Sequence, residues 1–112
     1  MKVKYFVKYN DKDKYPWVLS DMVSGGIDLL ELLLASDLAS MSKINEFENI
    51  VFVKEEIWWF NATKVEIDGD FIKISPAFDI YSIWKIKVSI LKNIICDWKS
   101  FINKKIDVTK EY

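Results

Sequence analysis

The chain has 112 residues, which suits a single domain spanning residues 1–112, because two independent cores would each be too small to be stable. Its composition, 51% hydrophobic and 15% aromatic, excludes general disorder, and the single cysteine excludes an internal disulfide. The formal net charge is −1, all 16 basic residues are lysine and histidine is absent, which excludes Ser-His-Asp and Cys-His catalysis and any zinc site that needs histidine.

A β-strand is predicted over residues 2–9. There Val3, Tyr5 and other bulky residues alternate with lysines in the two-residue period of a strand with one buried face. The next residues, 10–16, are mostly charged or polar up to Pro16, which fixes its own φ and restricts the residue before it. We therefore expect this segment to be a loop.

A helix is predicted over residues 26–40. Its leucines, among them Leu30 and Leu34, recur at three- and four-residue spacing and form one apolar helical face. Residues 42–49 allow two interpretations, because Ser42 can cap a short helix or the segment can lead into a strand. The sequence leaves this choice open.

Extended structure is predicted from Ile50 onward, where aromatic and β-branched residues dominate. Residues 57–67 and 71–75 form a predicted hairpin, because the Asp-Gly pair between them tolerates the positive φ of a tight turn. A further strand is expected over residues 81–88, where bulky and polar residues alternate again.

The last predicted element is an amphipathic helix that begins at Ser89, a favourable N-cap residue. Leu91, Ile94 and Trp98 belong to one apolar stripe, so this helix must pack on a sheet. Together the elements predict an α+β fold with one mostly antiparallel sheet of about four to five strands packed against two main helices.

The sequence predicts a cytoplasmic protein. The N-terminal residues contain no apolar run of signal-peptide length. The most apolar stretch, residues 27–35, includes Asp28 and Glu31 and is about half the ~20 residues needed to cross a bilayer. Because that stretch is too short to cross a bilayer, no membrane partner is expected. The lone Cys96 suits a reducing compartment.

Residues for catalysis or cofactor binding are scarce. A glycine pair precedes the predicted helix, but it lacks the spacing and the lysine-hydroxyl pair of a phosphate-binding loop. We expect no catalytic residue, no metal and no cofactor. The alternative is a small enzyme that uses a pair of carboxylates. The candidate pairs are Glu55 with Glu56, Asp68 with Asp70, and Asp11 with Asp13.

Charge is unevenly distributed along the chain. Residues 17–49 contain one lysine and six acidic residues, whereas residues 1–16 and 81–112 are rich in lysine. An acidic helical region suits contact with a cationic protein, although a solvated helix face has the same composition. No nucleic-acid partner is expected, because the balance is slightly acidic and arginine is absent. The predicted partner-binding residues are Asp21, Asp28, Glu31, Asp37, Trp17 and Trp58.

Adjacent tryptophans, Trp58 and Trp59, lie in the predicted hairpin. Neighbouring side chains of a strand point to opposite faces of the sheet, so only one of the two must be in the core. The other is an exposed anchor for a partner if its face is uncovered, or a buried residue if a second helix covers it. The sequence does not decide between these two arrangements.

The order of residue types from Trp58 to Ile102 resembles that of small bacterial immunity proteins of contact-dependent growth inhibition and polymorphic toxin systems. The matching segments are the tryptophan-bearing strand that ends in Asn61-Ala62, then Val65-Glu66-Ile67, Asp68-Gly69-Asp70, Ile72-Lys73-Ile74, Val88-Ser89 and Ile94-Ile95-Cys96-Asp97-Trp98-Lys99-Ser100-Phe101-Ile102. The resemblance covers about the last 45 residues up to the final helix and is a pattern of residue types.

This resemblance implies a bacterial protein that binds a cognate toxin domain, commonly a nuclease, and blocks its active site or substrate surface without catalysis of its own. The acidic segment 17–49 in turn predicts a cationic toxin, and a monomer or weak dimer is expected. Besides the carboxylate-dependent enzyme, a self-associating structural or adaptor domain is the remaining alternative.

Overall fold

In the computed structural model, which describes residues 1–79 and 81–112, the chain folds into helices and three antiparallel sheets. The α+β class is confirmed, but the prediction of one sheet with two main helices is wrong in detail. In chain order the elements are β1 (Lys2–Asn10), β2 (Asp13–Ser20), β3 (Val23–Ser24), β4 (Ile27–Asp28), α1 (Leu29–Glu31), the π-helical segment η1 (Leu32–Asp37), α2 (Met41–Phe47), the π-helical segment η2 (Glu48–Val53), β5 (Trp58–Trp59), β6 (Thr63–Asp68), β7 (Phe71–Pro76), β8 (Trp84–Lys87), α3 (Val88–Lys104) and β9 (Val108–Glu111).

The first sheet has the strand order β2-β1-β9. The predicted strand over residues 2–9 is confirmed, but the predicted loop over 10–16 is wrong, because the chain turns at once and returns as β2. Asp11 allows the tight turn by adopting a φ of 54°. Pro16 is tolerated because β2 is an edge strand, where a missing N–H need not break a ladder.

The predicted helix over 26–40 is shorter in the structure and begins after Asp28. Residues before it pair as β3 and β4 around Gly25 and Gly26, whose φ values are 58° and 79°. Asp28 is the N-cap, and its carboxylate accepts from the N–H groups of the first helical turn. At the other end the helix widens, since the N–H of Leu38 donates to the carbonyl of Leu33 at 2.9 Å.

The segment 41–53 is helical throughout, as α2 followed by η2, so the extended structure predicted from Ile50 is wrong up to Val53. Short apolar runs do not distinguish a buried helix from a strand, and here Phe47 and Val51 face the core one helical turn apart. Of the two interpretations of residues 42–49 the helix is confirmed, but the predicted cap is wrong, because Ser40 is the N-cap and Ser42 lies within α2.

The largest sheet has the order β5-β6-β7-β8. The predicted hairpin is confirmed in β6 and β7, which are joined by the two-residue turn at Gly69, with a φ of 63°. Its first strand is interrupted, because the N–H of Phe60 donates to the carbonyl of Thr63 and turns the chain between β5 and β6. The strand predicted over 81–88 is confirmed only as β8, and α3 begins at Val88, one residue before the predicted cap.

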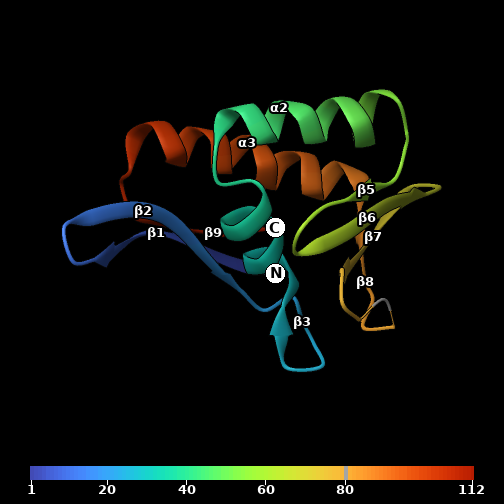
Figure 1. The fold of residues 1–112 in the computed structure, drawn as a ribbon, viewed down its shortest axis with the longest axis horizontal. Helices are drawn as coiled ribbons and strands as arrows, with labels where there is room; N and C mark the ends of the chain where they lie inside the picture. The colour runs from blue at the N-terminus through green and yellow to red at the C-terminus, as the bar shows by residue number, and fades with distance from the viewer. Residues whose placement is uncertain (80) are drawn as a thin grey trace.

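Helices and sheets share one cluster of buried side chains, to which each of the longer elements contributes. Figure 1 shows α2 and α3 side by side, with α1 and η1 below them between the two larger sheets. The apolar stripe predicted for the last helix is buried, and the indole N–H of Trp98 donates to the carbonyl of Leu38 at 2.8 Å. The chain ends lie together, since β9 pairs with β1.

Candidate protein-binding site

The acidic residues predicted to contact a partner have different places in the structure. Asp37 is only 2% exposed and accepts hydrogen bonds from the N–H of Ala62, the N–H of Thr63 at 3.0 Å and the Thr63 hydroxyl at 2.6 Å. Asp28 is half-buried and accepts from the N–H and hydroxyl of Ser20 at 2.6 and 2.7 Å. Asp37 is therefore occupied by donors inside the fold and Asp28 by a helix cap, and the partner contact of both stays a prediction.

The other two predicted acidic residues lie nearer the surface. Asp21 is exposed where β2 leads into β3, and its carboxylate accepts from the N–H of Lys2 at 3.4 Å. Glu31 is half-buried at the end of α1. Asp21 therefore lies beside the start of β1, and Glu31 lies at the end of α1.

The tryptophan pair is split by the sheet, and the predicted residue is the buried one. Trp58 is 3% exposed and packs edge-to-face on Phe47, so it belongs to the core and its partner contact stays a prediction. Trp59 is 60% exposed, with the ammonium of Lys64 5.0 Å from its ring. Trp17 is half-buried on β2, under the ammonium of Lys8 at 4.2 Å.

The β7–β8 loop presents large apolar side chains to solvent. Phe78 is 74% exposed and Tyr81 is 90% exposed. The carboxylate of Asp79 accepts from the N–H of Tyr81 at 3.2 Å and from the hydroxyl of Ser82 at 2.7 Å. The loop therefore holds two aromatic rings outward on a hydrogen-bonded frame.

The β3–β4 turn packs against this loop. A Cβ atom on Gly25 would lie 3.1 Å from the Ser82 hydroxyl, so the two turns are in contact through a position without a side chain. Val23 beside the turn and Ile83 beside the loop are 45% and 47% exposed. Figure 1 shows both segments at the same end of the molecule. We call this surface the apolar tip, and it consists of Val23, Phe78, Tyr81 and Ile83.

Acidic residues dominate the sequence of the two segments that form the apolar tip, where Asp28 caps α1 and Asp21 lies beside Lys2. The two segments that form this end, residues 17–31 and 75–84, contain four carboxylates and no lysine. An apolar patch with a rim of one charge sign has the composition of a protein interface. The four carboxylates are Asp21, Asp28, Glu31 and Asp79.

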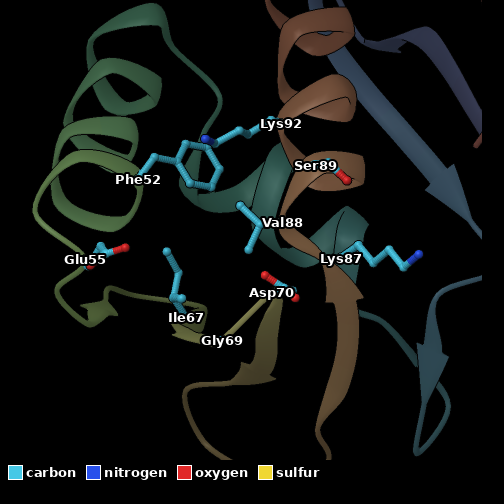
Figure 2. Close-up of a pocket in the computed structure, with 9 residues that line it drawn as sticks. All are labelled: Phe52, Glu55, Ile67, Gly69, Asp70, Lys87, Val88, Ser89 and Lys92. Carbon is cyan, nitrogen blue, oxygen red and sulfur yellow. The ribbon is translucent and has the colours of Figure 1, made fainter.

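A separate cavity of about 540 Å³ lies between the end of η2, the β6–β7 turn and the start of α3. Figure 2 shows Asp70 near Val88 at its centre, with Glu55 across from it, whereas Lys87 points away. Glu55 and Asp70 come from two different predicted pairs. Their predicted partners, Glu56 and Asp68, do not line this cavity. The complete lining is Phe52, Glu55, Ile67, Gly69, Asp70, Lys87, Val88, Ser89 and Lys92.

The charges of this cavity balance, because two lysines accompany the two carboxylates. The ammonium of Lys92 lies 5.3 Å from the ring of Phe52. In the described part of the chain, no three acidic or cysteine side chains gather as a metal site, and Cys96 is exposed on α3. Likewise, no helix within residues 1–79 and 81–112 has the length and apolar character needed to cross a bilayer.

Comparisons with known proteins identify no relative. Searches against profiles of known protein families, against curated protein sequences and against solved structures found no match to this chain. Function is therefore argued from the surface itself. The sequence did not reveal the apolar tip, because the alternation of Tyr81, Ser82 and Ile83 predicts a strand; the signal for a loop was Pro76 shortly before it.

Proposed function

We propose that the protein is a cytoplasmic immunity protein, which binds a cognate bacterial toxin domain through the apolar tip and neutralises it by covering its active site or substrate surface. The observation that carries this proposal is the pair of exposed rings, Phe78 and Tyr81, held out from the body of the fold by Asp79. Large exposed aromatic side chains are the residues that most often dominate binding energy at protein interfaces.

Hydrogen bonds within the described residues of the loop favour binding. A segment that already makes its own hydrogen bonds loses less conformational entropy when a partner covers it. The Asp79 carboxylate makes two such bonds, to Tyr81 and Ser82, and Ser82 lies close to Gly25 of the β3–β4 turn. Burial of Tyr81 and Phe78 in a partner is then expected to contribute about 2 kcal/mol or more each.

The acidic rim specifies the charge of the partner. Four carboxylates without a lysine in the two segments attract a cationic surface and repel an acidic one. A nuclease has such a cationic surface, because it must bind the phosphate backbone of its substrate. Binding at the tip would occlude that surface, and the association rate would fall as salt is added.

The experiment is a protection assay in bacteria. The domain encoded immediately upstream of this chain is expressed with and without the protein, and growth and complex formation are measured. We expect growth to be rescued by the native chain and lost with Tyr81→Ala and Phe78→Ala. Tyr9→Ala is the matched control, since Tyr9 is 66% exposed at the far end of β1. A metabolic gene in that position would refute the proposal. Full rescue of growth by a variant that carries both Tyr81→Ala and Phe78→Ala would also refute it.

The alternative function is a small carboxylate-dependent enzyme, favoured by the place of Glu55 and Asp70 on one cavity. The variants Glu55→Gln and Asp70→Asn distinguish the two functions. Both replace a carboxylate by an isosteric amide at an exposed position, so they leave the fold intact. Protection that is unchanged in both variants supports binding, whereas protection lost in both and retained in Tyr81→Ala supports catalysis.

A further inference from the structure

The four-stranded sheet has one uncovered face. Along its strands the residues alternate between buried ones, such as Val65 and Ile74, and exposed or half-buried ones that point away from the core. Figure 1 shows α2 and α3 on the other side of the sheet. We call this surface the open sheet face, and it consists of Trp59, Lys64, Glu66, Asp68, Phe71, Lys73, Lys85 and Lys87.

Charges of both signs alternate across the open sheet face. Glu66 lies 4.0 Å from the ammonium of Lys64 and 3.9 Å from that of Lys73. Asp68 lies 3.8 Å from Lys73 and 3.3 Å from Lys85. The result is a continuous row in which each carboxylate lies between two lysines.

Two aromatic residues flank this charged row. Trp59 is 60% exposed at one corner and Phe71 is 42% exposed at the other. The outer face of an antiparallel sheet is normally polar, so large rings on it indicate a surface that another molecule covers.

We propose that a second copy of this chain covers the open sheet face, so that the protein forms a face-to-face homodimer. The register provides one self-complementary ion pair at the centre of the face, because Glu66 on β6 is the direct cross-strand partner of Lys73 on β7. The two-fold axis lies midway between the two sheets, above the line between β6 and β7 and parallel to these strands. It places Glu66 of each copy over Lys73 of the other. Sheets packed face to face lie about 10 Å apart, a gap that these long side chains span from both sides.

The same axis also places Trp59. Because β5 and β8 are on opposite sides of the β6–β7 pair, the operation lays β5 of one copy over β8 of the other. Trp59 is thereby removed from water against the partner's edge strand. A polyanion such as single-stranded nucleic acid fits less well, because Glu66 and Asp68 occupy the middle of the face and repel phosphates.

This dimer is independent of the proposed function, since the open sheet face and the apolar tip share no residue. Dimer formation and toxin binding can therefore be tested separately, and the failure of one does not imply the failure of the other. Four short strands form a small interface, so the dimer is expected to be weak and to dissociate on dilution.

The test is sedimentation equilibrium of the full chain over a wide concentration range. We expect the native chain to approach the dimer mass at high concentration. Glu66→Lys and Lys73→Glu should each raise the dimer dissociation constant about tenfold or more, because the axis counts each lost contact twice. The double variant should restore the dimer, since the exchanged charges again face each other. Tyr81→Ala, at the apolar tip, is the control and should dimerise as the native chain does.

Circular dichroism checks that each charge variant is folded, and Trp59→Ser provides a second disruption that leaves the ion pairs in place. A native chain that stays monomeric at all concentrations overturns the proposal. So does a Glu66→Lys variant that is folded and dimerises with unchanged affinity. Quenching of Trp59 fluorescence by an oligonucleotide, with the protein monomeric, would also overturn it in favour of a nucleic-acid surface.

Discussion

Removal of the Asp37 carboxylate should be among the most destabilising single changes in this protein. Its oxygens accept from the N–H of Ala62 at 3.1 Å, the N–H of Thr63 at 3.0 Å and the Thr63 hydroxyl at 2.6 Å, and Asp37 and Thr63 are both buried. These bonds attach the end of η1 to the start of β6, where the chain enters the large sheet.

The magnitude follows from the donors left behind. Asp37→Ala leaves two backbone N–H groups and one hydroxyl without acceptors, and each buried unsatisfied donor costs about 1–3 kcal/mol. Water can reach Ala62, which is half-buried, so the expected loss is about 3–5 kcal/mol of the free energy of unfolding. Asp37→Asn retains one acceptor oxygen, and it should cost roughly 1–3 kcal/mol.

Urea denaturation followed by tryptophan fluorescence measures these changes. Thr63→Val, alone and combined with Asp37→Ala, completes a double-mutant cycle, and the combined loss should be smaller than the sum because the hydroxyl donor has gone. Asp21→Ala is the control, since Asp21 is exposed, and should change stability by less than about 0.5 kcal/mol. A loss below about 1 kcal/mol in Asp37→Ala would show that the three bonds do not support the fold.

Three further outcomes are expected. Burial raises the pKa of the Tyr5 and Tyr112 phenols above their ordinary value of 10.0, so the folded state holds both protons more tightly than the unfolded one. The stability that they contribute is complete below about pH 10 and is lost above it, so urea titrations at rising pH should show a smaller loss in the Tyr5→Phe/Tyr112→Phe double variant. Trp58→Phe removes a buried indole N–H that has no partner, so in the same assay it should cost about 1 kcal/mol less than Trp98→Phe, which loses the bond to a carbonyl; equal costs would contradict this account. Gly25→Ala should lower the thermal midpoint more than Gly26→Ala, because both have positive φ but only the first new methyl meets another side chain, 3.1 Å away; the reverse order would show that the two turns do not touch.

Local pattern alone was sufficient for several elements. The alternation over residues 2–9 predicted β1, the Asp-Gly pair predicted the β6–β7 turn, and the apolar stripe that includes Ile94 predicted the buried face of α3. In each case the deciding interaction lies within a few residues along the chain, in the pleat, the turn or the helical repeat. Such signals are present in the sequence before any tertiary contact forms.

The candidate site could not be predicted from local sequence pattern. Asp28 and Asp37 were expected at the surface because acidic residues usually are, yet backbone donors from distant segments draw both into the fold. Tyr81 was assigned to a strand, because only the hydrogen bonds of Asp79 show that this part of the chain is a loop. Short apolar runs such as 50–53 were ambiguous for the same reason, since packing decides their conformation.

Composition and short-range periodicity predict the α+β class and the position of the final helix, and the absent histidine excludes catalysis that needs an imidazole. The packing of the folded chain decides which tryptophan of the adjacent pair is exposed and which carboxylates are buried. These depend on which face of a strand meets the core and on donors that arrive from elsewhere in the chain, and neither is encoded within a single element. The apolar tip arises in the same way, because two turns about 55 residues apart in sequence meet at Gly25 and Ser82.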